Sequence, residues 1–270
     1  MNEKVVLITG ASSGIGRALA FAFGREGARI AVCGRQADAL QAVSNELQQA
    51  GITVFSQTAD VSVEADVKQL IEQTIAQFGR LDILINNAGI SMRSLLIDTD
   101  PAVIQKVMAI NFMGTVYATR YALPHIQQTK GSIVGISSIA GYRGLPVRSG
   151  YSASKFAMNG FLEALRTELL HTGVHVLTAS PGFTASNIRF SALDAHGQTK
   201  GETMRDEGSM MSAEECADYI LRAVKQRKRE LILTTQGKLT VFLNKLFPAL
   251  VDRLAFNTLA KEKDSPLKRQ

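Results

Sequence analysis

Tyr151 and Lys155 are the two side chains in this sequence best suited to moving a proton. They stand four residues apart in a segment of helical pattern, which places them on one helix face, one turn apart. A free tyrosine has a pKa of about 10, so it is a poor acid or base near neutral pH. A lysine ammonium about 4 Å from the phenol would stabilise the phenolate by roughly 4 kcal/mol at an effective dielectric constant of about 20. The positive end of a helix that begins near Ser149 or Gly150 would act in the same direction.

One pKa unit corresponds to about 1.36 kcal/mol, so this stabilisation of the phenolate would lower the tyrosine pKa by about three units. The spacing therefore predicts a tyrosine that can act as an acid or base near neutral pH. An ordinary tyrosine and lysine on a surface helix would produce the same pattern. The neighbouring motifs decide between these two interpretations.

A glycine-rich turn near the amino terminus is the first of those motifs. The run Lys4–Thr9 is rich in β-branched residues, the sequence TGASSGIG follows at 9–16, and a helical pattern then continues to Gly27. Strand, glycine turn and helix in this order form an anion site, because glycine allows close backbone approach and the first helix N–H groups are available. The spacing G-x-x-x-G-x-G differs from the common dinucleotide fingerprint and lacks the Lys-Ser/Thr of a P-loop.

Gly34 and Arg35 come directly after the second predicted strand, Arg29–Cys33. In dinucleotide-binding units an acid near this point takes the ribose hydroxyls of NAD, whereas an arginine accommodates the 2′-phosphate of NADP. A glycine at the acid position leaves room for that phosphate, and Arg35 supplies positive charge. We therefore expect NADP(H) as the preferred cofactor and NAD(H) as the alternative. The competing interpretation is a solvated loop arginine.

The alternation of strand-like and helical segments continues along the chain. Helical patterns run over 37–50, 63–78, from Pro101 toward Pro124, and from about 150 onward. This alternation predicts an α/β fold, a Rossmann-like doubly wound parallel sheet of about seven strands with helices on both faces and ligands at the carboxyl ends of the strands. The length suits one domain spanning 1–270. The predicted strands cover 4–9, 29–33, 52–57, 81–85, 132–137, 174–180 and 230–234.

Two further turns follow predicted strands. Asp60-Val61 comes after the third strand, where the acid could accept from an adenine amino group while Val61 packs on the ring. Asp60 could equally cap the next helix, and the two roles are compatible. The run Asn86-Asn87-Ala88-Gly89 follows the fourth strand, and its small and amide residues suit a backbone that passes close to a cofactor.

These features together resemble the single-domain, NADP-preferring branch of the short-chain dehydrogenase/reductase family, with some similarity to hydroxysteroid-dehydrogenase-like reductases. The similarity covers residues 4–182 and extends toward about 235. Gly135 departs from the pattern, because many relatives carry asparagine there, and Ser186 stands where a threonine often follows the Pro-Gly turn. The matching motifs are T-G-x-x-x-G-x-G at 9–16, Asp60-Val61, N-N-A-G at 86–89, Asn111, Ser138, Tyr151-x-x-x-Lys155 and Pro181-Gly182.

The resemblance implies reversible hydride transfer between a nicotinamide and a carbonyl or alcohol carbon. Tyr151 would be the general acid for reduction and the general base for oxidation, and Lys155 would lower its pKa and bind the nicotinamide ribose. Ser138 would donate to the developing alkoxide. Asn111 would hold a helix bend and a water linking Lys155 to solvent. No metal is implied.

The resemblance also implies which residues bind the cofactor. Besides Tyr151 and Lys155, they are Gly10, Ser12, Ser13, Gly14, Ile15, Gly16, Arg35, Asp60, Val61, Asn87, Ala88, Gly89, Pro181, Gly182, Phe183, Thr184 and Ser186.

Composition narrows the remaining functions. The net charge of +6 comes from 30 basic and 24 acidic residues, but the basic residues are dispersed without interleaved aromatics, which disfavours nucleic acid as a partner. Cys33 and Cys216 match no metal-ligand spacing and are expected to be reduced core residues of a cytoplasmic protein. The first strand begins almost at the first residue, which leaves no room for a signal peptide.

Two segments have no assigned chemistry. Residues 187–211 carry glycines and methionines with little periodicity and are expected to form a substrate lid, with Met204, Met210 and Met211 lining a pocket or padding the core. Residues 238–262 form an apolar helical extension that would pack on the core or a subunit, border the substrate pocket, or lie on a membrane as a peripheral contact. An ordinary transmembrane span is ruled out by charges and a proline in this segment.

The resemblance further implies a homodimer or homotetramer through helices near 103–123 and 150–170, and apolar extensions in some membrane-associated relatives suggest a lipophilic substrate. Arg148 is expected in a surface salt bridge rather than in contact with substrate. The alternative to an enzyme is a catalytically weak protein of this fold that senses the cofactor or acts as a scaffold.

Overall fold

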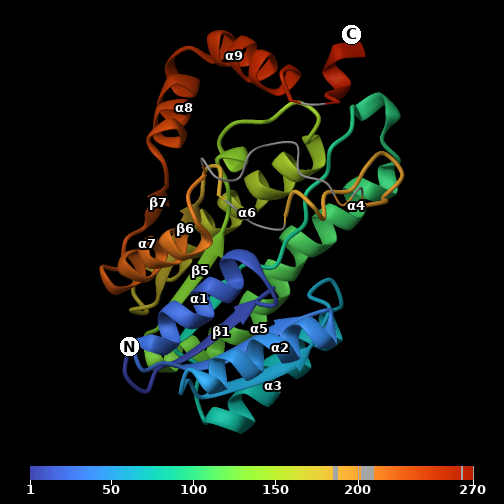
Figure 1. The fold of residues 1–270 in the computed structure, drawn as a ribbon. Coiled ribbons are helices and arrows are strands. Elements are labelled where there is room, and N and C mark those ends of the chain that lie inside the picture. Colours follow the sequence, from blue (N-terminus) through green and yellow to red (C-terminus); the bar gives the residue numbers. More distant parts are fainter. Residues whose placement is uncertain (185–187, 200, 202–209, 263, 270) are drawn as a thin grey trace.

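The computed structural model describes residues 1–184, 188–199, 201, 210–262 and 264–269. In these residues seven parallel strands form one sheet, in the order β3-β2-β1-β4-β5-β6-β7 (Figure 1). The chain order reverses between β1 and β4, so a crevice opens there at the carboxyl ends of the strands. This confirms the predicted fold. The strands are β1 Val5–Thr9, β2 Arg29–Gly34, β3 Val54–Thr58, β4 Ile83–Asn86, β5 Ser132–Ile136, β6 His175–Ser180 and β7 Glu230–Ile232.

Helices cover both faces of the sheet because the strand side chains alternate between two apolar cores. Val5 and Leu7 of β1 enter the core shared with α3, α5 and α6, whereas Val6 and Ile8 enter the core shared with α1, α2 and α7. Both sides of the central strands are thus buried. The helices are α1 Gly14–Arg25, α2 Ala37–Gln49, α3 Glu64–Phe78, α4 Pro101–Met108, α5 Gly114–Thr129, α6 Ser149–Glu168, α7 Ala213–Lys225, α8 Thr235–Leu246 and α9 Pro248–Ala260.

Local sequence signals explain some of the helix ends. Asp100 caps α4 by accepting a hydrogen bond from Ala102 N at 2.9 Å, with Pro101 at the first helical position. Asp60 is not the cap of α3, as one interpretation had it, because the cap position is Val63. The Asp60 carboxylate instead accepts hydrogen bonds from the backbone N–H and hydroxyl of Ser62, in the turn before that helix.

Both cysteines are buried and free, as expected for core residues. Burial raises the pKa of each thiol to about 12, so neither provides a thiolate near neutral pH.

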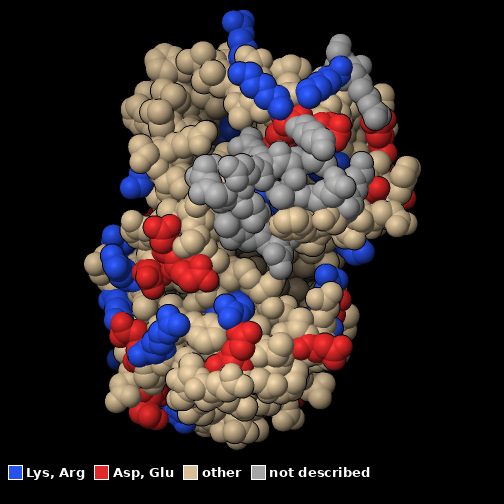
Figure 2. All heavy atoms as spheres, viewed as in Figure 1, with Lys and Arg blue, Asp and Glu red and all other residues tan. Residues whose placement is uncertain are grey.

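The C-terminal extension is two helices rather than one. Phe247 ends α8, and Pro248 begins α9 at a position where proline needs no N–H partner. Val241, Val251 and Leu259 are buried, so part of the segment packs on the protein as one interpretation proposed. Helices α8 and α9 lie at one end of the molecule (Figure 1), where much of the surface carries no charged side chain (Figure 2). Seven larger apolar side chains of this segment stay exposed. They are Leu239, Phe242, Leu246, Phe247, Leu250, Leu254 and Phe256.

Within the described residues, no helix combines the length and the apolar character that crossing a membrane requires.

Candidate active site

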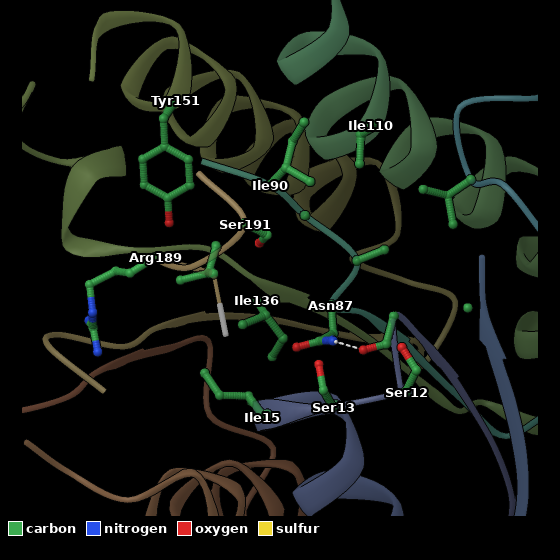
Figure 3. A pocket seen from close by; sticks show the side chains of 18 of the residues that line it. Ser12, Ser13, Ile15, Asn87, Ile90, Ile110, Ile136, Tyr151, Arg189 and Ser191 are labelled. Carbon is green, nitrogen blue, oxygen red and sulfur yellow. Dashed lines mark hydrogen bonds between the residues drawn. The ribbon is translucent and has the colours of Figure 1, made fainter. Parts of the chain in front are cut away.

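A cavity of about 1110 Å³ lies at the carboxyl ends of the central strands (Figure 3). Tyr151 reaches it from α6 with its hydroxyl pointing inward, while Ser12, Ser13 and Ile15 approach from the opposite side. The predicted residues that line it are Gly10, Ser12, Ser13, Gly14, Ile15, Gly16, Arg35, Val61, Asn87, Ala88, Gly89, Ser138, Tyr151, Lys155, Pro181, Gly182 and Thr184.

The other predicted residues lie elsewhere. Asn111 is fully buried beneath the site, and Asp60 and Phe183 are not part of the cavity wall. Ser186 and Met204 fall outside the described residues, as does most of the segment 200–209.

The glycine turn fits a phosphate group. Gly10 has a φ of +66°, and a Cβ there would stand 2.7 Å from the Cα of Ala88. A Cβ on Gly16 would stand 2.3 Å from the carbonyl oxygen of Gly10. Within the described chain the Ser13 side chain caps no helix N–H, so the first N–H groups of α1 face the cavity without a side-chain partner. The turn has the close backbone and the helix terminus that an anion requires.

Thr9 holds this turn against the end of β4, a role that the sequence did not single out. Its hydroxyl oxygen accepts hydrogen bonds from the backbone N–H groups of Asn87 and Ala88, each at 3.0 Å. The Asn87 side-chain amide donates to the carbonyl oxygens of Thr9 and Gly10, each at 2.9 Å. The two switch-point strands are therefore locked together beneath the cavity. The threonine immediately before the first glycine was the available signal.

Arg35 lies at the end of β2, beside the cavity and half exposed. Its guanidinium is 4.0 Å from the Asp60 carboxylate. Burial acts to raise the pKa of Asp60, but hydrogen bonds from Ser62 and the charges of Arg35 and Lys106 outweigh burial and lower it. A Cβ on Gly34 would already stand 3.2 Å from the Ser12 hydroxyl, so a larger side chain would crowd this corner.

Lys155 is buried, and its ammonium donates a 2.8 Å hydrogen bond to the carbonyl oxygen of Ile136. Burial lowers its pKa to about 8. The nitrogen stands 5.8 Å from the centre of the Tyr151 ring, so both side chains of the predicted pair meet at the cavity.

The predicted lowering of the Tyr151 pKa is wrong for this structure. Burial raises the pKa of Tyr151, and a hydrogen bond with Ser138 and the charges of Arg148 and Arg189 oppose that effect without overcoming it. The Lys155 ammonium, 5.8 Å from the centre of the ring, does not reverse the direction of this shift. The physical reason is that its ammonium is directed at Ile136 and that both groups are out of water.

Asn111 joins the segment after β4 to α6. It sits in a π-helical turn, Ala109–Met113, between α4 and α5, which corresponds to the expected helix bend. Its side-chain oxygen accepts from Ile90 N at 2.8 Å, and its amide donates to Ile90 O and to the Ser154 hydroxyl, each at 2.9 Å. Ser154 in turn donates to the Tyr151 carbonyl oxygen at 2.7 Å. These contacts position the first turns of α6.

Gly135, one of the two departures from the family pattern, has a packing explanation. A Cβ there would stand 2.3 Å from Leu162 Cδ1 of α6. The glycine therefore lets the helix that carries Tyr151 and Lys155 lie close on β5.

Two arginines near Tyr151 differ from expectation. Arg148 forms an ion pair with Glu262, but both side chains are largely buried, so the predicted surface salt bridge is a buried one. Arg189 lines the cavity and donates to the carbonyl oxygen of Thr184 at 3.0 Å. Sequence reasoning missed Arg189, because nothing in its neighbourhood distinguishes it from a surface arginine.

No three His, Cys, Asp or Glu side chains of the described residues lie close enough together to hold a metal ion.

The doubly wound sheet, the glycine turn and the Ser, Tyr and Lys side chains at the strand ends define a dinucleotide-binding protein with acid–base groups at the cofactor pocket. The short chain dehydrogenase family model matches residues 4–196, and the chain belongs to this family. It is a dehydrogenase/reductase that acts on CH–OH groups.

Named relatives and solved structures agree with this assignment. "Dehydrogenase/reductase SDR family member 7B" of Bos taurus is 37% identical over 98% of this chain and 84% of its own length. "11-beta-hydroxysteroid dehydrogenase-like 4A" of Arabidopsis thaliana is 37% identical over 93% of this chain and 83% of its own length.

A short chain dehydrogenase/reductase from Burkholderia phymatum in complex with NAD has a TM-score of 0.83 at 24% identity, over 92% of this chain and 95% of the other. An alcohol dehydrogenase from Thermococcus sibiricus complexed with 5-hydroxy-NADP has a TM-score of 0.75 at 26% identity, over 85% of this chain and 95% of the other.

Proposed function

We propose that the protein is an NADP(H)-dependent oxidoreductase that interconverts a lipophilic ketone or aldehyde with its alcohol. The observation that carries the proposal is the meeting of Ser138, Tyr151 and Lys155 at one cavity whose other end is the glycine turn. The bound nicotinamide would supply or accept the hydride.

Four side chains, those of Ser138, Tyr151, Lys155 and Asn111, would each have a separate role in the reaction. During reduction Ser138 donates a hydrogen bond to the carbonyl oxygen, and Tyr151 donates the proton that completes the alcohol; during oxidation Tyr151 takes that proton back. Lys155 binds the nicotinamide ribose. Asn111 holds the backbone that positions α6. Removing the Tyr151 hydroxyl therefore removes the proton donor while leaving the cofactor pocket in place.

The preference for NADP(H) rests on the corner formed by Gly34 and Arg35. A half-exposed guanidinium there can pair with a 2′-phosphate, and Lys106, which also lines the cavity, adds positive charge. No acid stands at the end of β2 to bind the ribose hydroxyls of NAD.

The preference for a lipophilic substrate rests on the apolar side chains in the cavity wall. Five large ones line the cavity together with polar residues, and they favour a substrate with an apolar body. They are Ile90, Ile110, Ile188, Phe190 and Leu193.

A peripheral contact with an anionic lipid surface is part of the same proposal. The helices that carry the exposed apolar side chains also carry Lys238, Lys245 and Arg253, and Asp252 is paired with Arg143. Apolar area next to positive charge is the combination that holds helices at a lipid headgroup region.

A homodimer or homotetramer would use the outer faces of α5 and α6. Phe156 of α6 is 46% exposed. Phe112 of the π-helical turn before α5 contacts Phe161 of α6 edge to face. Light scattering on wild type and Phe156→Glu tests this interface; an unchanged mass would contradict it.

The test of the function is NADPH oxidation with a panel of ketones, aldehydes and quinones, comparing wild type with Tyr151→Phe. We expect turnover of at least one lipophilic ketone, reduced by about 10²-fold or more in the variant, since a general acid contributes about 10²–10⁴ in rate. NADPH should bind both proteins equally. Binding without turnover across the panel would instead support the alternative, a cofactor sensor or scaffold.

A further inference from the structure

We call residues 259–268, of which 263 is not described, the C-terminal strap. After α9 the chain turns back toward the segments that precede α4 and α6 (Figure 1). Leu259 and Leu267 of the strap are buried with Val147 in a small apolar cluster that is separate from the two main cores. Leu95 and Leu145 pack against it. The strap thus closes a minor core over the loops at 93–99 and 144–148.

Glu262 places a buried carboxylate in the middle of this contact. Its Oε2 lies 3.2 Å from Nη2 of Arg148 and 3.5 Å from Nε of Arg93. The Glu262 side chain is 4% exposed. A buried carboxylate between guanidinium groups constrains all of them, because moving any one away breaks a charge pair that is out of water. The strap, the loop before α4 and the start of α6 are therefore joined at one point.

Val147 gives a second, independent sign that this point is under constraint. Its φ is +58°, a left-handed conformation that is strained for a β-branched residue. Its carbonyl oxygen accepts a 2.9 Å hydrogen bond from Ser94 N, and its side chain is buried against Leu259 and Leu267. Strained backbone persists only where the surrounding structure enforces it, and here part of that structure is the strap.

Arg148 and Arg93 both make backbone hydrogen bonds to segments that form the active site. Arg148 is the residue before α6, and its carbonyl oxygen accepts from Ser152 N at 2.8 Å, so Tyr151 lies on the helical turn that Arg148 begins. Arg93 N donates to the carbonyl oxygen of Leu193 at 2.8 Å, and Leu193 lines the cavity. The charge of Arg148 is also one of the groups that oppose the burial-driven rise in the pKa of Tyr151.

We propose that Glu262 is a positioning residue for the active site: through Arg148 and the strained Val147, the strap holds the start of α6 in the conformation that places Tyr151 at the cavity. Glu262 does not itself line the cavity, as far as the described residues define it. The kinetic consequence rests on the proposed role of Tyr151 as proton donor. The structural consequence does not.

The structural consequence is tested by hydrogen–deuterium exchange on the full chain without substrate. Glu262→Gln should exchange about tenfold faster or more than wild type in peptides covering 144–152, because loss of the charge pair allows local opening there. Peptides covering 10–16 should be unchanged. The control is Glu168→Gln, the same change at an exposed position near the end of α6. Unchanged exchange at 144–152 would overturn the proposal, whatever the enzymatic activity.

The kinetic arm is a double-mutant cycle of Glu262→Gln and Arg148→Gln, using a ketone that the panel identifies. We expect each single variant to lower kcat by about tenfold or more, since small misplacements of a reacting group are costly, with KM for NADPH within about twofold of wild type. The double variant should be no slower than Arg148→Gln alone. Fully additive losses would mean that Glu262 does not act through Arg148 and would overturn the proposal.

Glu262→Gln removes the carboxylate that Arg93 and Arg148 share. It is therefore the variant with the greatest risk of misfolding. If it fails to fold, the double variant carries the exchange measurement, because it removes one guanidinium together with the carboxylate. Faster exchange at 144–152 in the folded double variant supports the proposal, and wild-type exchange overturns it.

Discussion

The Lys155 ammonium donates a 2.8 Å hydrogen bond to the carbonyl oxygen of Ile136, the last residue of β5. The contact fixes a buried charge at the end of a central strand, beside the cavity, and ties α6 to the sheet. It also directs the ammonium at β5, whereas helical spacing alone predicts that it faces the phenol.

The pKa of Lys155 predicts a pH dependence of stability. Burial lowers this pKa from 10.5 to about 8. Below about pH 8 the folded protein bears the full cost of the buried ammonium, and between that pH and 10.5 the unfolded chain binds a proton that the folded protein has lost. Stability should therefore rise with pH across this window. The full effect is about 3 kcal/mol at about 1.36 kcal/mol per pKa unit.

Urea unfolding of the cofactor-free protein measures this effect against Lys155→Met. Between pH 7 and 9.5 the wild type should gain about 2 kcal/mol relative to the variant. A constant difference between the two proteins would show that the lysine is not buried as a charged group.

Arg35→Ala should weaken NADPH binding and leave NADH binding nearly unchanged. Loss of a charge-assisted hydrogen bond to a phosphate is worth about 1.5–3 kcal/mol, or roughly 10- to 100-fold in Kd. Fluorescence titration with both cofactors measures the two constants. Arg120→Ala, an exposed arginine on α5, is the matched control. Equal affinities of the wild type for the two cofactors would contradict the NADP preference.

Gly135→Asn, which introduces the residue that the family resemblance leads us to expect here, should destabilise this protein. The added Cβ would stand 2.3 Å from Leu162 Cδ1, and overpacking of this kind costs about 1–3 kcal/mol. Thermal unfolding should show a lower Tm. Gly135→Asn combined with Leu162→Ala should be less destabilised than the sum of the two single variants, because the truncated leucine gives the asparagine space; strict additivity would rule out the clash.

Phe242→Glu with Phe247→Glu should abolish binding to vesicles containing anionic lipid. Both side chains are more than half exposed, so the fold should be retained. Wild-type binding should weaken as salt increases, because the basic residues contribute through screened attraction. Tyr219→Glu, an exposed aromatic on α7, is the control and should bind as wild type does. Vesicle sedimentation is the measurement, and equal binding by the double variant would remove the proposed membrane contact.

Local pattern was sufficient for the sheet and for most of the cavity wall. Strands such as β1 are continuous apolar runs because both of their faces are covered, and the glycine turn, Asn87 and Tyr151 follow strands whose carboxyl ends meet at one edge. Chain order and residue type determine these features, so the sequence alone could predict them.

Other features depend on contacts between distant parts of the chain, which only the tertiary structure decided. The pairing of Arg148 with Glu262 joins residues more than a hundred positions apart, and no local signal marks it. The direction of the Tyr151 pKa reflects the depth of its burial, which spacing along a helix does not reveal. The sequence by itself determined which side chains stand at the strand ends, because alternation and turn chemistry act locally. The tertiary structure decided the pKa values of these side chains and the contacts that hold them in position, through the packing of α6 and the C-terminal strap. The reason is that desolvation and ion pairing depend on which distant residues the whole fold brings together.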